Sequence, residues 1–358
     1  MRTAVFLFLM LLARVSPAQL VSAYSDIREY FYAFDNGTFN QLEYLPIVSY
    51  SVSGNSIAYI DNTREFKIYY DGLVHKQEIY AADFKYYSTG CIVPFQLGRA
   101  LYVFDRGQRT PLTYYASSFA AGDSIVAFFD ETSPGLKIYE NHRVFEAETS
   151  MLQNPRQVRA GGNLIGYVDP SDYLKIYYHG VITTLSQSPP LSFSAGSDIM
   201  AYEDGYEQSF MVFYKGDTAR LEIFPPLSYK TGYGILAYVD NLGEFKILSR
   251  GALQKVNSYA PTAYEVNGNM VVYALNNRFM VFYDGQETEL ENFIPSDYQV
   301  SMNGVAYKDI LGRLKFFWKG ELYTASYDVI TDFTLNGDVL SYETGPKHTR
   351  FFFNGKSY

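Results

Sequence analysis

Short runs of alternating hydrophobic and polar residues recur along the chain and predict β-strands. In Phe245-Lys246-Ile247-Leu248, the alternation places Lys246 on the opposite face of a strand from Phe245 and Ile247. Residues 264–290 contain four such runs, separated by turn residues, and the third and fourth are joined by Asp284-Gly285. An Asp-Gly pair of this kind favours a two-residue hairpin turn. Beyond the N-terminal apolar run there is no helical periodicity, so the pattern predicts an all-β fold.

This four-strand unit is repeated along the chain. Each copy opens with a glycine, and successive opening glycines are 32 to 40 residues apart: Gly54, Gly90, Gly122, Gly162, Gly196, Gly232, Gly268, Gly304 and Gly337. An aromatic residue follows each of them at a nearly fixed distance: Tyr59, Phe95, Phe128, Tyr167, Tyr202, Tyr238, Tyr273, Tyr307 and Tyr342. A side chain that recurs at one place in every unit is expected to pack between neighbouring units.

Units of about 35 residues with four antiparallel strands (A to D) predict the blades of a β-propeller. A β-solenoid is the rival, but its parallel coils would not need a hairpin turn in each unit. The first unit, at residues 20–43, lacks strand A, and the last, ending at residue 358, is expected to lack strand D. Eight full units lie between them, and pairing of the N-terminal strands with the last unit would close the ring. The sequence leaves the number of blades at nine or ten.

The N-terminus has the features of a secretory signal peptide. Arg2 precedes the apolar run at residues 4–13, and Ser16-Pro17-Ala18 then offers small residues for cleavage. The run is too short to span a bilayer, which needs about 20 residues. We therefore expect a signal peptide at 1–18, a single propeller domain at 19–358, and no transmembrane segment. The expected location is the periplasm, either free or associated with the periplasmic side of an outer membrane. The one cysteine, Cys91, cannot form an internal disulfide and is expected to be buried.

The composition narrows the possible partners. With 29 basic and 38 acidic side chains, the formal net charge is −9. A nucleic-acid-binding protein needs clustered lysine and arginine to neutralise phosphates, so binding to nucleic acid is not expected.

Acidic residues end several B strands and are the candidate partner-binding residues: Asp61, Asp130, Asp169, Asp240 and Asp309. If all the blades share one orientation, these carboxylates would form an acidic face for a basic partner. The alternative is that they are turn residues, since aspartate commonly stabilises turns by accepting backbone hydrogen bonds.

Motifs for catalysis or metal binding are weak. The four histidines, His75, His142, His179 and His348, lie in or near turns of different units without metal-ligand spacing. Gly122-Asp123-Ser124 is similar to a hydrolase nucleophile motif, but the same place in other units is a Gly-Asx turn. We therefore predict no catalytic residues, no cofactor and no metal.

The phrase Tyr-x-Asp-Asn-x-x-x-Phe-Lys-Ile at Tyr238–Ile247 resembles repeats of exported β-propeller proteins from Bacteroidota-type bacteria. This resemblance implies a non-enzymatic interaction subunit of the cell envelope with an outer-membrane or periplasmic protein partner, similar to the periplasmic plug subunit of the type IX secretion translocon. Two other classes stay open: a secreted or periplasmic carbohydrate-binding propeller, and a hydrolase or lyase with its site in the central channel.

Overall fold

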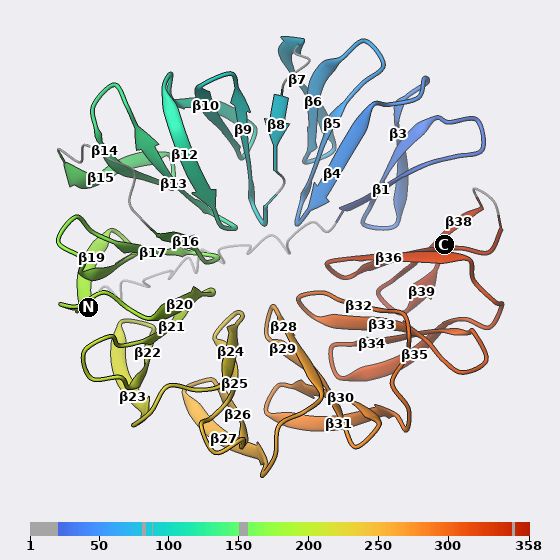
Figure 1. The fold of residues 1–358 in the computed structure, drawn as a ribbon. Coiled ribbons are helices and arrows are strands. Elements are labelled where there is room, and N and C mark those ends of the chain that lie inside the picture. Colours follow the sequence, from blue (N-terminus) through green and yellow to red (C-terminus); the bar gives the residue numbers. More distant parts are fainter. Residues whose placement is uncertain (1–20, 81–83, 88, 150–156, 346–347) are drawn as a thin grey trace, which may run out of the picture.

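The computed structural model describes residues 21–80, 84–87, 89–149, 157–345 and 348–358, which form ten antiparallel sheets arranged in a ring (Figure 1). The predicted all-β propeller is confirmed, and the number of blades is ten. The expected signal peptide at 1–18 lies outside the described residues. We number the blades in chain order and keep the letters A to D for the strands of a blade.

Blades 1 to 3 contain the first eleven strands. Blade 1 comprises β1 (Val21–Ser25), β2 (Phe31–Asp35) and β3 (Thr38–Glu43). Blade 2 comprises β4 (Ser49–Ser53), β5 (Ser56–Ile60), β6 (Glu65–Tyr70) and β7 (Leu73–Tyr80). Blade 3 comprises β8 (Phe84–Tyr86), β9 (Ile92–Leu97), β10 (Ala100–Asp105) and β11 (Gln108–Thr113).

Blades 4 to 7 continue the four-stranded pattern. Blade 4 has β12 (Ala116–Ala121), β13 (Ile125–Asp130), β14 (Gly135–Glu140) and β15 (Arg143–Thr149). Blade 5 has β16 (Val158–Ala160), β17 (Leu164–Val168), β18 (Leu174–Tyr178) and β19 (Val181–Ser186). Blade 6 has β20 (Ser192–Ala195), β21 (Ile199–Glu203), β22 (Phe210–Tyr214) and β23 (Asp217–Glu222). Blade 7 has β24 (Ser228–Thr231), β25 (Ile235–Val239), β26 (Phe245–Ser249) and β27 (Ala252–Asn257).

Blades 8 to 10 complete the ring. Blade 8 has β28 (Ala263–Asn267), β29 (Met270–Leu275), β30 (Arg278–Tyr283) and β31 (Gln286–Glu291). Blade 9 has β32 (Tyr298–Val300), β33 (Gly304–Lys308), β34 (Leu314–Trp318) and β35 (Glu321–Ser326). Blade 10 has β36 (Asp332–Asn336), β37 (Val339–Glu343), β38 (Thr349–Phe353) and the short β39 (Lys356–Ser357).

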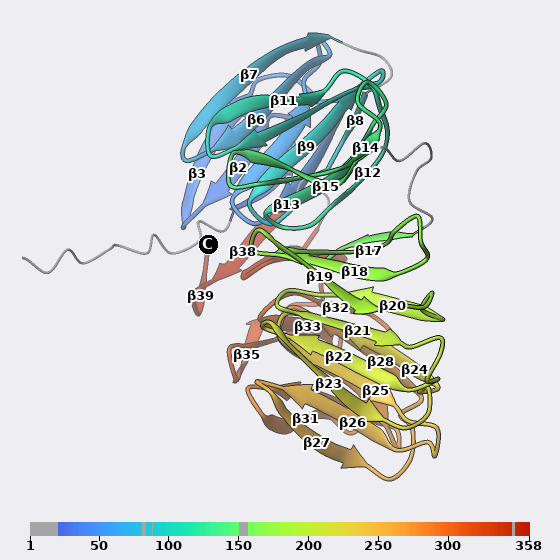
Figure 2. The ribbon, with the colours of Figure 1, turned by 90° about the vertical axis from the view of Figure 1, so that its left-hand side faces the viewer.

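The strands of each blade are hydrogen-bonded in chain order, with strand A nearest the centre of the ring and strand D at the rim (Figure 1). Seen from its side, the ring presents the outer strands β15, β19, β23 and β27 of successive blades (Figure 2). Because neighbouring strands are antiparallel, the B–C turns and the D–A connections lie on one face, which we call the B–C face. The A–B and C–D turns lie on the opposite face, which we call the A–B face.

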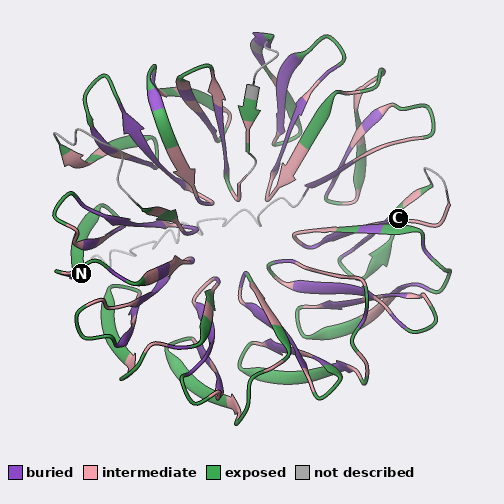
Figure 3. Ribbon diagram, in the orientation of Figure 1, coloured by how far each residue is buried: buried purple, intermediate pink, exposed green. Residues whose placement is uncertain are grey.

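The hydrophobic core lies between the blades, in the B and C strands (Figure 3). The recurring aromatic side chains are buried there; Tyr238 and Tyr273, for example, have exposed fractions of 0% and 1%. Tyr273 of blade 8 packs in one cluster with Phe245 and Ile247 of blade 7. The predicted packing role of this aromatic position is therefore confirmed. The D strands are mostly exposed, since only one of their faces meets the core.

Two kinds of turn residue have clear physical reasons. Asp284 and Gly285 both have positive φ angles, 53° and 82°, as the predicted two-residue hairpin requires. At the A–B turns the reason is close approach: a β-carbon on Gly122 would lie 1.7 Å from the carbonyl oxygen of Gly161 in blade 5. In blade 9 the recurring glycine, Gly304, is the first residue of β33, and Met302 lies in the A–B turn.

The ring closes by side-chain packing between blades 10 and 1. Phe34 of β2 stacks on Phe351 of β38, with ring centroids 4.5 Å apart and an interplanar angle of 7°. Val339 and Phe353 complete this cluster. In the described part of the chain, no sheet contains strands of both blades, so the expected closure by strand pairing was wrong. Blade 10 also has a short strand D, β39, so the expectation that the last unit lacks this strand was wrong.

Candidate interaction surfaces

The five aspartates predicted to bind a partner lie at the B–C turns but are buried, with exposed fractions between 2% and 8%. The Oδ1 atom of Asp240 accepts hydrogen bonds from the backbone N–H groups of Leu242 and Glu244, at 2.9 and 2.8 Å. Asp61, Asp169 and Asp309 accept two backbone hydrogen bonds at the same places in their own turns. Asp130 accepts one, from Thr132, and a second bond from the Thr113 hydroxyl. The alternative interpretation as turn residues therefore fits them.

Each of these carboxylates is also paired with a cation. Asp240 Oδ2 lies 2.8 Å from Lys246 Nζ, and the same lysine lies 2.8 Å from Glu222 Oε1 on β23 of the preceding blade. The carboxylate of Glu222 also accepts a 2.8 Å hydrogen bond from the hydroxyl of Tyr238. Blade 6 is thus joined to blade 7 by a lysine, two carboxylates and a tyrosine, which we call an interblade tetrad.

Two further tetrads join other blades. Blades 1 and 2 are linked by Glu43, Tyr59, Lys67 and Asp61, and blades 4 and 5 by Glu148, Tyr167, Lys175 and Asp169. These groups were not predicted from the sequence. The sequence did contain a signal for them. In several units a lysine lies between two apolar residues near the start of strand C, and a glutamate lies at or next to the end of the preceding strand D.

The ion pairs set the charge state of the aspartates. Burial by itself would raise the pKa of Asp240, but hydrogen bonds from Lys246 and from the backbone of Glu244 outweigh it and lower that pKa. The pKa values of Asp61, Asp130, Asp169 and Asp309 are lowered in the same way. Burial is offset likewise for Lys246, whose pKa is raised by the two carboxylates. The expected exposed acidic face was wrong: these carboxylates are ionised, buried and neutralised within the protein.

The motif Asp123-Ser124 takes part in contacts around the channel at the A–B face. The Ser124 N–H and hydroxyl both donate to the carbonyl oxygen of Gly162 in the next blade, at 3.1 and 3.3 Å. Asp123 accepts a hydrogen bond from the hydroxyl of Tyr233, which lies three blades further along the ring. Burial, with the neighbouring Asp123 carboxylate second, raises the pKa of Tyr233. Asp123 and Ser124 are thus placed as turn and interblade contact residues, as the repeat predicts.

The histidines and Cys91 do not form a site with one another in the described chain. His142 lies 3.7 Å from Asp105, and His179 lies 3.8 Å from Glu140, each across one blade interface. Among the described residues, no group of three His, Cys, Asp or Glu side chains is placed to hold a metal ion. Cys91 precedes β9 at the A–B face and is exposed, so its expected burial was wrong.

Exposed apolar side chains gather on the B–C face. They come from the turns and connections of nearly all the blades: Ile27, Tyr44, Leu45, Val48, Tyr114, Tyr115, Leu191, Tyr206, Ile223, Phe224, Leu227, Leu242, Tyr259, Ile294, Ile310, Leu311, Tyr327 and Val329. In the described residues, the turns of the A–B face contribute only Tyr87 and Met302. Exposed apolar surface concentrated on one side of a protein is typical of a binding surface.

Ten antiparallel blades around a central channel define the class of protein as a large β-propeller. A protein-family model described as the 10-bladed beta propeller domain matches residues 15–358, and the chain therefore belongs to that family. No curated protein matches the chain. Within the described residues, no helix is long and apolar enough to cross a membrane.

Several solved structures are similar in fold. The CRINKLY WD40 ectodomain of the receptor kinase ACR4 from Arabidopsis thaliana is 8% identical, with a TM-score of 0.35, over 66% of this chain and 92% of that chain. The computationally designed protein Ika8 is 13% identical, with a TM-score of 0.37, over 84% of this chain and 99% of that chain. PorZ, a type IX secretion component of Porphyromonas gingivalis, is 10% identical, with a TM-score of 0.31, over 95% of this chain and 59% of that chain.

Proposed function

We propose that this protein is a non-enzymatic interaction subunit of the bacterial cell envelope, whose B–C face binds an outer-membrane or periplasmic protein. The observation that carries the proposal is the concentration of exposed apolar side chains on that one face. Propeller folds suit protein binding, because a rigid ring presents many loops side by side. The buried aspartates stabilise the turns beneath this surface rather than contacting the partner.

The envelope location rests on the sequence. The signal-peptide pattern at residues 1–18 supports export, and the repeat phrase at Tyr238–Ile247 resembles exported propellers, including the plug subunit of the type IX translocon. We therefore propose a periplasmic protein that plugs or scaffolds an outer-membrane secretion complex. The partner surface is expected to be apolar at its centre, with aromatic and aliphatic side chains as the main anchors.

Crosslinking in cells of the source organism, followed by affinity purification and mass spectrometry, tests this proposal. The test variant is Phe224→Ser with Leu227→Ser, which removes two exposed apolar side chains of the B–C face; their exposed fractions are 58% and 70%. The matched control is Leu253→Ser with Leu322→Ser, two exposed side chains on the D strands at the rim.

We expect the parent and the control to crosslink to the same outer-membrane or periplasmic protein, and the test variant to lose most of that product. If the parent crosslinks to no envelope protein, or if the test variant and control behave alike, the proposal is wrong.

A further inference from the structure

Blade 1 ends at an open strand edge on its inner side. In the described part of the chain, β1 pairs only with β2 and is an edge strand, whereas the other nine blades have a strand A inside strand B. The register shows that β1 is a strand B: Tyr24 lies opposite Tyr32 just as Tyr59 lies opposite Lys67 in blade 2. Blade 1 therefore presents a place for one more strand.

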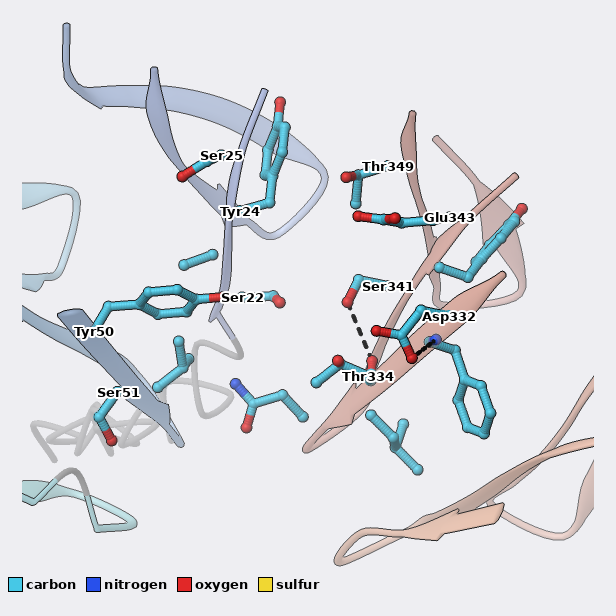
Figure 4. Close-up of a pocket in the computed structure, with 16 residues that line it drawn as sticks. Ser22, Tyr24, Ser25, Tyr50, Ser51, Asp332, Thr334, Ser341, Glu343 and Thr349 are labelled. Atoms are coloured by element: carbon cyan, nitrogen blue, oxygen red, sulfur yellow. Dashed lines mark hydrogen bonds between the residues drawn. The ribbon is translucent and has the colours of Figure 1, made fainter. Parts of the chain in front are cut away.

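This place is a cleft of about 460 Å³ between the A strands of the two neighbouring blades (Figure 4). Residues of β1 form its floor, β4 of blade 2 forms one wall, and β36 of blade 10 forms the other. The lining side chains include Tyr24, Tyr50, Asp332, Glu343 and Thr349. The cleft belongs to the innermost layer of the ring, and its end at Asp332 and Thr349 lies toward the B–C face.

The backbone of β1 is oriented to receive a strand. The Asp26 N–H donates to Tyr30 across the B–C turn, so the even-numbered residues of β1 bond toward β2. The Val21 N–H and carbonyl instead take partners outside the sheet, Gly54 and Asn336. Since bonding alternates along an antiparallel strand, Ala23 and Ser25 point their backbone groups into the cleft.

In other blades, the corresponding backbone groups of strand B form hydrogen bonds with strand A or with the residue just before it. In blade 2, the carbonyl oxygen of Ile60, which corresponds to Ser25, accepts a 2.9 Å hydrogen bond from the Val48 N–H just before strand A. The corresponding carbonyls of Glu203, Val239, Ala274 and Glu343 accept the same bond in blades 6, 7, 8 and 10. A fourth strand in blade 1 would satisfy the same pattern.

The register also specifies one side chain of the missing strand. In eight blades, the strand A residue opposite the recurring strand B aromatic is itself aromatic: Tyr50, Tyr86, Phe119, Phe193, Tyr229, Tyr264, Tyr298 and Phe333. In five of these blades its ring packs on a phenylalanine at the first or second position of strand C in the preceding blade, as Tyr264 does on Phe245 at 5.3 Å. For blade 1 the preceding blade is blade 10, where that residue is the smaller Thr349.

A hydroxyl partner is also in place. The Tyr264 hydroxyl donates to Ser228 Oγ, on the first residue of the preceding strand A, at 2.9 Å. Ser49 and Tyr86 are bonded in the same way, at 2.9 Å. In blade 10 the corresponding first residue is Asp332, a stronger acceptor, which in the described residues has no lysine or arginine partner. A tyrosine opposite Tyr24 would therefore reach a carboxylate.

We propose that blade 1 binds an extended, tyrosine-bearing segment of a partner protein, which pairs with β1 as the innermost strand of the blade. Main-chain hydrogen bonds would supply affinity, and the tyrosine site beside Asp332 and Thr349 would supply specificity. In blades 7 and 9, the residue after the aromatic is a lysine or a glutamine that reaches the next strand A: Lys230 donates to Tyr264 O, and Gln299 donates to Phe333 O, both at 2.8 Å. Tyr-Lys and Tyr-Gln are thus the preferred core of the segment. This site lies beyond the proposed function, because it uses the edge of β1 and not the exposed apolar side chains of the B–C face.

The probe is a capped, fluorescent heptapeptide with the sequence of residues 226–232, Pro-Leu-Ser-Tyr-Lys-Thr-Gly, which is strand A of blade 7. Fluorescence anisotropy measures its binding to the chain that begins at Gln19. We expect saturable one-to-one binding that weakens about tenfold or more when the peptide tyrosine is alanine, since both the ring contact and the hydroxyl bond are lost.

Two protein variants and one control sharpen the test. Asp332→Ala should weaken binding about tenfold. Asp328→Ala, which removes an exposed charge from the connection before β36, should leave binding unchanged. Thr349→Phe restores the aromatic platform of the sister blades and should tighten binding about two- to tenfold. Circular dichroism and size-exclusion chromatography establish that each variant is folded.

The proposal would be overturned if the peptide did not bind, or if a peptide with the same residues in scrambled order bound equally well. An unchanged affinity in both Asp332→Ala and Thr349→Phe would also overturn it. Self-association of the protein that the peptide disrupts would identify a second copy as the occupant, and would also overturn the assignment to a partner. Because the B–C face variants leave this cleft intact, the failure of either proposal is seen independently of the other.

Discussion

Phe34 of blade 1 and Phe351 of blade 10 lie face to face, 4.5 Å apart, and hold together the two ends of the chain. Both side chains are fully buried. Tyr24 and Phe39 make edge contacts with Phe351, at 5.2 and 5.7 Å. Within the described residues, blades 1 and 10 share no sheet, so the closure of the ring depends on this aromatic cluster.

Removing this cluster should open the ring. We expect Phe351→Ala to lower the free energy of unfolding by about 3–5 kcal/mol, the usual cost of deleting a buried phenylalanine ring. Deletion of residues 327–358 should abolish folding, because it exposes the apolar faces of blades 1 and 9. Chemical denaturation measures both effects. Tyr327→Ala is the control, because that side chain is 77% exposed, and its effect should be within about 0.5 kcal/mol. A soluble, cooperatively folded deletion variant would contradict closure through blade 10.

The interblade tetrad predicts that a single lysine is important for stability. Lys246→Met keeps much of the side-chain volume but leaves Asp240 and Glu222 without their cation. Breaking a buried ion pair in this way costs about 3–5 kcal/mol. Lys255→Met is the control, because Lys255 Nζ pairs with Glu244 at the surface and its side chain is 47% exposed. Surface pairs contribute about 0–1 kcal/mol. Equal stability of the two variants would show that the tetrad is not a stabilising contact.

The same contacts predict sensitivity to acid. A carboxylate whose pKa is lowered by folding stabilises the protein above its unfolded pKa of about 3.9, and this contribution is lost as the pH falls toward the folded pKa. The free energy of unfolding should therefore be level between about pH 5 and pH 8 and decline below about pH 4. Asp240→Asn should be less stable at pH 7 and should show a shallower decline in acid. Parallel pH profiles for parent and variant would refute the assignment of this decline to Asp240.

Because Cys91 is the one cysteine, we expect the thermal stability of the protein not to depend on reductant. The chain has one cysteine, so no intramolecular disulfide can form. Because Cys91 is exposed at the A–B face, a maleimide reagent should label it in the folded protein. The melting temperature should be the same with and without added thiol. A change of several degrees in monomeric protein would be inconsistent with this prediction.

Much of the architecture could be predicted because the same local sequence pattern is repeated in every blade. The Asp-Gly hairpins and the recurring aromatics identified the strands and the core, since each depends on residues close in sequence. The number of blades could not be decided, because it depends on how the ends meet, and Phe34 and Phe351 are far apart in the chain. Asp240 was expected at the surface because the pattern shows a turn residue but not the Lys246 side chain that covers it. The absence of strand A from blade 1 was predicted, but the cleft beside β1 was not, because its walls, β4 and β36, are far apart in the chain.

The glycines of the A–B turns give the last prediction. A β-carbon on Gly122 would lie 1.7 Å from the Gly161 carbonyl oxygen and 2.8 Å from its carbonyl carbon. These are backbone atoms of the neighbouring blade, so they cannot move aside without shifting β16. We expect Gly122→Ala to destabilise the protein by about 1–3 kcal/mol, as overpacking commonly does. Gly345→Ala is the control, since a β-carbon there would meet no atom within 4 Å. Thermal denaturation followed by circular dichroism compares the two variants. If both variants have the melting temperature of the parent, the blades can move apart at this turn without loss of stability. Close approach would then not explain why glycine recurs at this position.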